Sequence, residues 1–66
     1  MQYIKLSFKI FDKKIILKAF EDYRKVVNCK IEMDSEDSSI ITFHTDDSFV
    51  TKEFSNYLIA LSAGEV

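Results

Sequence analysis

Residues 29–45 read CKIEMDSEDSSIITFHT, and this stretch decides the fold. Its first part alternates apolar residues (Cys29, Ile31 and Met33) with charged ones, a period of two that predicts a half-buried strand over 29–34. Its last part, 40–45, is rich in β-branched and aromatic residues, so we expect a second strand whose Ile41 and Phe43 face the core. The polar turn between them, residues 35–38, predicts an antiparallel hairpin.

The residues before this hairpin predict a further strand over 3–10. Apolar and polar residues alternate there without a break. One face would carry Ile4, Leu6, Phe8 and Ile10, and the opposite face Tyr3, Lys5, Ser7 and Lys9. A strand with one apolar face is typical of a sheet that packs on one side only.

A helix is expected between this strand and the hairpin. Asp12 is a good N-cap, and Phe11 and Ile16 are spaced to pack together as a hydrophobic staple. Asn28 can adopt the left-handed conformation that ends a helix. The apolar residues recur in one helical stripe: Ile15, Ile16, Ala19, Phe20, Tyr23, Val26 and Val27.

A second helix is expected over residues 49–62. The preceding run, Asp46 to Ser48, supplies acidic and capping groups for its N-terminus, where the helix dipole favours negative charge. Gly64 follows its end. Its predicted core stripe consists of Val50, Phe54, Tyr57, Leu58 and Leu61.

The predicted element order is therefore strand, helix, strand, strand, helix. A right-handed crossover between the first two strands leaves a gap that the third strand fills on its return. We expect an α+β fold with a three-stranded antiparallel sheet of order 1-3-2 and both helices on one face. It resembles a split-βαβ or ferredoxin-like unit that lacks the last strand.

The chain is long enough for one domain of 66 residues, with a small core. The usual supplements to a small core are disulfides, a structural metal or a partner subunit. A single cysteine, Cys29, excludes an internal disulfide, and Cys29 with His44 falls short of the four ligands of a structural zinc site. By elimination, a partner chain is the expected source of further stability.

Charge and hydropathy narrow the possible partners and the compartment. The formal net charge of −2 argues against direct nucleic-acid binding, which normally requires a basic surface. The first residues contain no apolar core of a signal peptide, and no apolar run approaches membrane-spanning length. A lone cysteine fits a reducing environment. We therefore expect a cytoplasmic protein that binds no membrane.

The sequence offers few groups for catalysis. A phosphate-binding glycine loop is excluded, since Gly64 is the only glycine. Cys29 and His44 form at most a partial catalytic pair, and the predicted strands point them to opposite faces of the sheet. The carboxylates of the two acidic loops lack calcium-loop spacing. We expect a non-catalytic protein with no catalytic, cofactor-binding or metal-binding residues.

The predicted topology leaves surfaces that a partner could cover. The outer edge of the first strand has no neighbour, and unpaired edges recruit other strands. Leu17 and Ile59 lie off the buried stripes of their helices. The open face of the sheet would display Tyr3, Lys5, Ser7, Lys9, Ile40, Thr42 and His44.

The whole chain, and its C-terminal half most of all, resembles the small HxsD-like proteins of His-Xaa-Ser peptide-maturation systems. The most specific part is the run from Glu53 to Ile59, in which Glu-Phe precedes Ser-Asn-Tyr and two aliphatic residues. The resemblance also rests on 12–14, 18–23 and 40–43. It implies an accessory, non-catalytic role beside a radical-SAM enzyme that modifies a ribosomally made peptide.

The layout is also similar to a second family, the small dimerisation subunit of the KEOPS complex, which modifies tRNA. The shared features are the element order, an acidic residue after the third strand (Asp46) and the run from Ser55 to Leu58. A third reading is a homodimer of unassigned role. The candidate protein-binding residues are Tyr3, Lys5, Ser7, Lys9, Ile40, His44, Glu53, Asn56 and Ile59.

Overall fold

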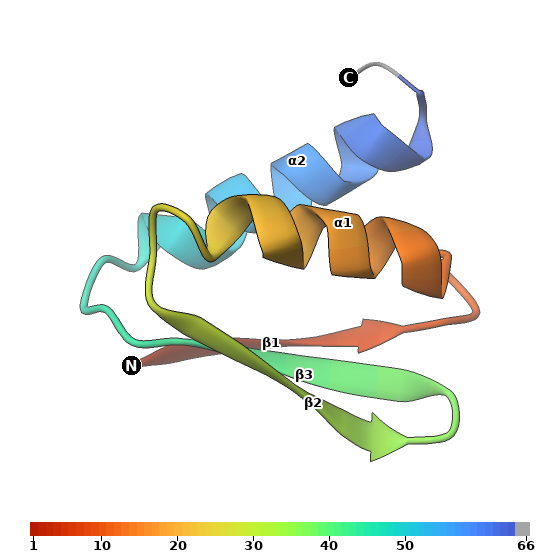
Figure 1. Ribbon diagram of the computed structural model, residues 1–66, viewed down its shortest axis with the longest axis horizontal. Coiled ribbons are helices and arrows are strands. Elements are labelled where there is room, and N and C mark those ends of the chain that lie inside the picture. Colours follow the sequence, from red (N-terminus) through yellow and green to blue (C-terminus); the bar gives the residue numbers. More distant parts are fainter. Residues whose placement is uncertain (65–66) are drawn as a thin grey trace.

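The computed structural model describes residues 1–64 of the chain. Within these residues the chain forms three strands and two helices in the order expected from the sequence. The elements are β1 (Gln2–Ser7), α1 (Lys13–Tyr23), β2 (Cys29–Ser35), β3 (Ser38–Phe43) and α2 (Phe49–Ser62) (Figure 1).

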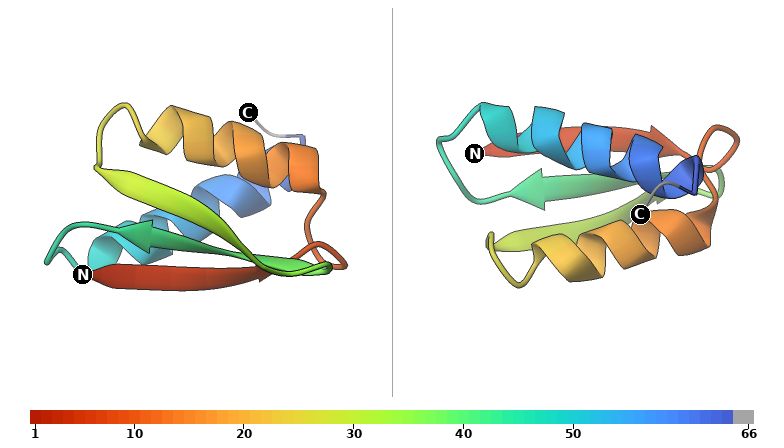
Figure 2. Two further views of the ribbon diagram at one scale, coloured as in Figure 1. Left: turned by 60° about the horizontal axis from the view of Figure 1, so that its bottom comes forward. Right: turned by 90° about the horizontal axis from the view of Figure 1, so that it is seen from above.

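The strands form one antiparallel sheet of order β1-β3-β2. Both helices cover the same face of this sheet, with α2 over the β1 side and α1 over the β2 side (Figure 2). The predicted α+β fold, strand order and placement of the helices are confirmed. The described residues leave the other face of the sheet uncovered, and we call it the open face.

A short hairpin turn joins β2 to β3 and places the two strands side by side. Only Glu36 and Asp37 separate β2 from β3. The hydroxyl of Ser38 donates to Asp34 Oδ2 at 3.2 Å and lies 3.0 Å from the hydroxyl of Ser35, which ties the two strand ends together. β3 thus begins at residue 38, earlier than the predicted residue 40, and ends at Phe43 rather than Thr45.

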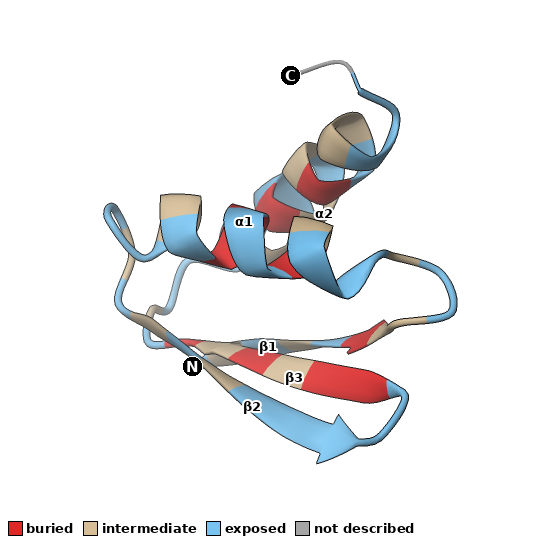
Figure 3. Ribbon diagram, turned by 45° about the vertical axis from the view of Figure 1, so that its right-hand side comes forward, coloured by how far each residue is buried: buried red, intermediate tan, exposed pale blue. Residues whose placement is uncertain are grey.

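The core lies between β3 and the two helices, and Figure 3 shows how much of β3 is buried. Phe54 is at its centre. The Phe54 ring meets Phe43 edge-on, with ring centroids 5.3 Å apart, and Tyr23 edge-on at 5.1 Å. The buried apolar residues are Leu6, Ile16, Ala19, Phe20, Ile41, Phe43, Val50, Phe54 and Leu58. The predicted core residues Ile41 and Phe43 are confirmed.

β1 is shorter than predicted. It ends at Ser7, where the carbonyl oxygen accepts the N–H groups of both Ile10 and Phe11 at 3.1 and 3.0 Å and closes a turn. The last contact with the sheet is the bond from the Phe8 N–H to the Asp37 carbonyl oxygen, 2.7 Å, because β3 offers no partner beyond it. The prediction that Ile10 continues the buried face was wrong, and its side chain is 75% exposed.

α1 begins as predicted and ends early. The Asp12 carboxylate accepts the N–H of Lys14 at 2.8 Å, which confirms the N-cap. The helix stops at Tyr23, and the N–H groups of Val26 and Val27 both donate to the Tyr23 carbonyl oxygen in a tight turn towards β2. Val26 is 78% exposed, so its predicted place in the buried stripe was wrong. Among residues 1–64 only Gly64 has a positive φ, so Asn28 does not end the helix in the left-handed conformation.

α2 spans the predicted residues, with different capping. The Asp47 carboxylate accepts the N–H of Phe49 at 2.9 Å, whereas Ser48 makes no side-chain cap. Gly64 follows the helix with φ of 74°, a conformation that glycine adopts without strain. Its N–H donates to the Leu61 carbonyl oxygen at 3.1 Å.

A hydrogen bond joins the two helices above the core. The hydroxyl of Tyr57 on α2 donates to Asp22 Oδ2 on α1 at 2.5 Å. This bond lowers the pKa of Asp22, and the Lys18 ammonium, 3.6 Å from the same oxygen, acts in the same direction. The bond also raises the pKa of Tyr57. The ionised Asp22 carboxylate is therefore the form that holds α2 against α1.

We predict that Tyr57→Phe lowers the melting temperature at pH 7, because it removes this bond. A depressed carboxyl pKa stabilises the fold above the unfolded-state value of about 3.9, and this contribution is lost as pH falls through the folded-state pKa. The difference between variant and wild type should therefore shrink towards pH 3. Circular dichroism melts at both pH values measure it. Tyr3→Phe, which removes an exposed hydroxyl, is the control, and equal melting temperatures for wild type and Tyr57→Phe at pH 7 would contradict the prediction.

Candidate protein-binding surface

The open face brings together three of the predicted binding residues. Tyr3, Lys5 and Ile40 lie on neighbouring strands, and Lys5 is directly opposite Ile40. Tyr3 is 72% exposed, while the central strand keeps Ile40 half-buried. Two rows of residues cross this face, Tyr3–Thr42–Lys30 and Lys5–Ile40–Glu32.

Ion pairs occupy the charged side chains of the open face. Lys5 Nζ lies 2.9 Å from Asp34 Oδ2, and Lys30 Nζ lies 3.1 Å from Glu32 Oε1. The hydrogen bonds from Lys5 and Ser38 hold the pKa of Asp34 below its usual range. Because β3 separates β1 from β2, the Lys5–Asp34 pair bridges the two edge strands. Such exposed pairs add little stability, and they present a partner with compensated rather than free charge.

The structure moves Ser7, Lys9 and His44 away from the middle of this face. Ser7 ends β1, and its hydroxyl accepts the N–H of Lys9 at 3.2 Å. Lys9 lies in the following turn, with Nζ 4.0 Å from Asp37 Oδ2. His44 follows β3 at the opposite end of the sheet. Lys9 and His44 therefore lie beyond the ends of β1 and β3, outside the strands that the sequence predicted to carry them.

Glu53, Asn56 and Ile59 form a separate exposed patch on α2. α2 packs on the helix-covered face, so this patch and the open face belong to different sides of the protein (Figure 1). Sequence reasoning missed Phe49, an exposed aromatic residue on the first turn of α2. Its spacing of four and seven residues from Glu53 and Asn56 was the signal that places it on the same helical stripe.

The hydrogen bonds at the strand ends show which backbone N–H and C=O groups point outward at the two edges of the sheet. The Phe8 N–H donates to Asp37, and the His44 N–H donates to the Asn28 carbonyl oxygen. Inward-pointing groups alternate with outward-pointing ones along a strand. At the outer edge of β1 the N–H and C=O groups of Tyr3, Lys5 and Ser7 therefore point outward. At the outer edge of β2 the N–H and C=O groups of Cys29, Ile31 and Met33 point outward. No other described strand pairs with either edge.

A pocket between α1 and β2 was not foreseen from the sequence. Ser39 lines it from β3, although this serine is only 1% exposed. Its hydroxyl has no hydrogen-bond partner among the described residues. A buried hydroxyl without a partner is costly, which makes Ser39 an unusual residue for the floor of an apolar sheet face. Ser39 belongs to a polar run, residues 34–39, which is typical of a turn, so its burial could not be predicted from the local pattern.

Cys29 at the start of β2 and His44 just after β3 lie at the same end of the sheet but in different environments. Cys29 pairs with Phe43 and packs against the core. Burial raises the pKa of the Cys29 thiol, with Arg24 opposing the shift. A thiol held protonated is a weak nucleophile. His44 is exposed, and among the described residues no group of three or more histidine, cysteine, aspartate and glutamate side chains is placed to hold a metal ion.

Neither described helix is both long and apolar enough to cross a membrane. Compared with protein-family models, with curated proteins and with solved structures, the chain matches none.

We predict that Ser39→Ala raises the free energy of unfolding by about 1–3 kcal/mol, because it removes a buried hydroxyl that lacks a partner. Urea unfolding followed by circular dichroism measures the change. Ser38→Ala is the matched control. Ser38 is also buried but hydrogen-bonded to Asp34, so its loss should destabilise the protein by about 1 kcal/mol. Destabilisation by Ser39→Ala as large as that of Ser38→Ala would show that the Ser39 hydroxyl is satisfied in solution.

We also predict that iodoacetamide alkylates Cys29 more slowly in the folded protein than in the urea-unfolded chain at pH 7.5. Burial and the raised pKa both limit the thiolate, and the difference should narrow above about pH 8.5, where an ordinary thiol ionises. Mass spectrometry of timed samples gives both rates. Faster alkylation of the folded protein would instead identify an activated cysteine.

Proposed function

We propose that this protein is a non-catalytic accessory protein that binds a protein or peptide partner through the outer edge of β1. The observation that carries the proposal is the unpaired edge, where the backbone groups of Tyr3, Lys5 and Ser7 point outward. Such an edge binds an extended segment by continuing the sheet, with the main chain supplying the hydrogen bonds.

The residues around this edge support a larger contact. Tyr3 provides an exposed aromatic ring on the open face, and aromatic residues are enriched at protein interfaces. α2 lies over the β1 side of the sheet (Figure 2). A partner larger than one strand therefore extends from the edge towards Tyr3 and Ile40 on one side, or towards the Glu53, Asn56 and Ile59 patch on the other.

We further propose that the partner belongs to a cytoplasmic peptide-maturation system, as the HxsD-like resemblance implies. Phe54 and Leu58 of the resembling run are buried, so packing alone explains them. Glu53 and Asn56 of the same run are exposed. These two are therefore free to contact a radical-SAM enzyme or its peptide substrate, and they supply the specific part of this proposal.

The alternative is a small dimerisation subunit of a KEOPS-like tRNA-modifying assembly. The same β-α-β-β-α order and the small core support it, since a core of this size gains stability from a partner subunit. Both proposals assign the protein a binding role. They differ in the identity of the partner.

The first experiment is affinity capture of the tagged protein from its source cells, with identification of bound proteins, peptides and RNA. An iron–sulfur radical enzyme or a short precursor peptide supports the peptide-maturation proposal. KEOPS subunits or tRNA support the alternative instead. Recovery of the protein only as its own dimer would contradict both.

We predict that Lys5→Pro abolishes capture of the partner while the domain stays folded. The Lys5 N–H points outward, so proline removes a donor to the partner without breaking a bond to β3. Lys5→Ala controls for the lost ion pair with Asp34 and should bind as the wild type does. Met33→Pro makes the equivalent change at the outer edge of β2 and should leave capture intact. Unchanged capture by a folded Lys5→Pro protein would rule out the β1 edge.

A further inference from the structure

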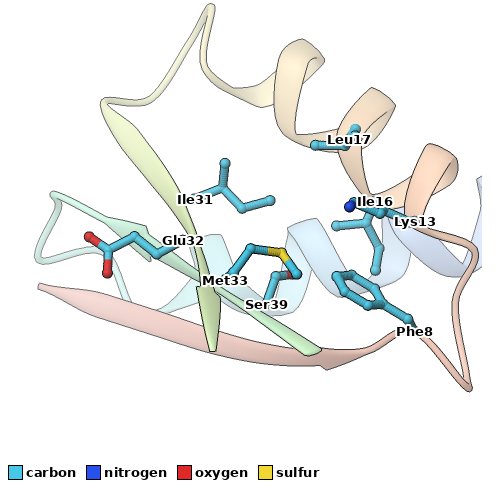
Figure 4. Close-up of a pocket in the computed structure, with 8 residues that line it drawn as sticks. All are labelled: Phe8, Lys13, Ile16, Leu17, Ile31, Glu32, Met33 and Ser39. Carbon is cyan, nitrogen blue, oxygen red and sulfur yellow. The ribbon is translucent and has the colours of Figure 1, made fainter. Parts of the chain in front are cut away.

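The pocket between α1 and β2 has a volume of about 240 Å³ and is mainly apolar (Figure 4). α1 contributes Ile16 and Leu17, β2 contributes Ile31 and Met33, and Phe8 closes one end. Met33 is 58% exposed and Leu17 is also exposed, so the apolar lining continues to the protein surface. A pocket of this size holds one large side chain.

The floor of the pocket carries a polar group without a partner. Ser39 lies directly opposite Met33 in the sheet, and Figure 4 shows the Met33 side chain next to it. The Ser39 hydroxyl is buried and makes no hydrogen bond with any described residue. An occupant with an apolar body and a hydrogen-bonding atom at its end would fill the pocket and satisfy this hydroxyl.

The pocket adjoins the free edge of β2. The outward-pointing backbone groups of this edge belong to Cys29, Ile31 and Met33, and the last two also line the pocket. A strand added to this edge would lie about 4.8 Å from β2 and would point every second side chain towards α1. Main-chain pairing beside a side-chain pocket is the arrangement by which sheet edges recognise extended peptides.

We propose that the β2 edge and this pocket bind an extended polypeptide segment, which inserts one large side chain with a polar end between α1 and β2. Tyrosine fits best, because its ring matches the apolar walls and its hydroxyl can hydrogen-bond to Ser39 once the side chains that cover the Ser39 hydroxyl move aside. The rim carries Lys13, stacked 5.6 Å from the centre of the Phe8 ring, and Glu32. One charge of each sign gives no preference for a charged occupant.

The geometry favours a peptide over a second copy of this chain. The pairing of β2 with β3 shifts register between Met33 and Ser35, so the regular part of the edge covers only 29–33. Such an irregularity bends a strand away from flat edge-to-edge pairing. A stable dimer buries about 800 Å² on each partner, far more than five residues and one pocket provide.

This site is independent of the docking surface proposed above, because β2 and β1 form opposite edges of the sheet. The test uses the hexapeptide acetyl-Thr-Thr-Tyr-Thr-Thr-Thr-amide and its Phe and Ala versions at the third position, titrated into the 15N-labelled protein. We expect saturable shifts at the amides of 29–33 and 13–17 and none at 3–7. The Ala peptide should bind at least about tenfold more weakly, as expected for the loss of a buried large side chain.

Three comparisons sharpen the test. Met33→Lys should weaken binding of the Tyr peptide at least about tenfold, whereas Ile59→Lys, at an exposed apolar residue of α2, should not. Ser39→Ala should remove the preference for Tyr over Phe without abolishing binding. Two N-methylated peptides test strand pairing: one is methylated at the odd-numbered residues and the other at the even-numbered residues. Because alternate N–H groups face β2 in a paired strand, at least one of the two peptides should lose binding. Lys5→Pro, which acts on the β1 edge, should leave all of these results unchanged.

Four results would overturn the proposal. They are the absence of saturable shifts with every peptide, binding of both N-methylated peptides as tightly as the unmethylated peptide, binding of free p-cresol as tightly as the Tyr peptide, and shifts at 29–33 that depend only on protein concentration. The second and third would indicate a small-molecule pocket, and the last would indicate a second copy of the chain. Loss of partner capture through β1 would leave this proposal intact, so the two failures are distinguishable.

Discussion

The pairing of β3 with both β1 and β2 is the constraint on which the rest of this structure depends. β3 carries Ile41 and Phe43 into the core, and Phe43 positions the Phe54 ring, which in turn meets Tyr23. α2 is thereby held against a strand that is itself held from two sides, and α1 packs on α2 through Tyr23 and Phe54. The central strand also defines the two edges, because it uses its own backbone groups on both flanks.

The two edges that this arrangement creates differ in their surroundings. The β1 edge is straight over its length, adjoins the exposed ring of Tyr3 and lies below α2. The β2 edge is interrupted near Met33 and adjoins the pocket beneath α1. If both proposed sites are used, an enzyme could bind at one edge and an extended peptide at the other. This arrangement would suit an accessory protein that brings a substrate to a modifying enzyme.

At Ser39 the proposed binding role and the stability of the small core conflict. Among residues 1–64 nine apolar residues are buried, and beside them lies a serine hydroxyl that has no hydrogen-bond partner within this range. Its cost is large compared with the marginal stability of a domain of this size. A ligand that offers a hydrogen bond to Ser39 would recover part of this free energy, so the same atom that weakens the free protein would strengthen the complex.

Short-range patterns in the sequence determined the kind and order of the elements. Alternation in 3–7 and 29–33, the Asp12 cap and the stripe of Val50, Phe54 and Leu58 each identify an element from its own residues, because these signals depend on local geometry. The sequence pattern also led to the strand order, since the crossover and the short hairpin permit few arrangements. Of the candidate binding residues, Tyr3, Lys5 and Ile40 were correctly placed on one face.

Tertiary structure decided where the elements end and what lies between them. β1 ends at Ser7 because β3 has no further residues to pair with it. Val26 is exposed because the chain turns after α1 to enter β2. Lys9 and His44 consequently fall beyond the strands that were expected to hold them. The pocket and the unpartnered Ser39 arise from the spacing of α1 and β2, which are brought together from distant parts of the chain. No local pattern encodes such a distance, because it is set by how side chains of several elements pack at once.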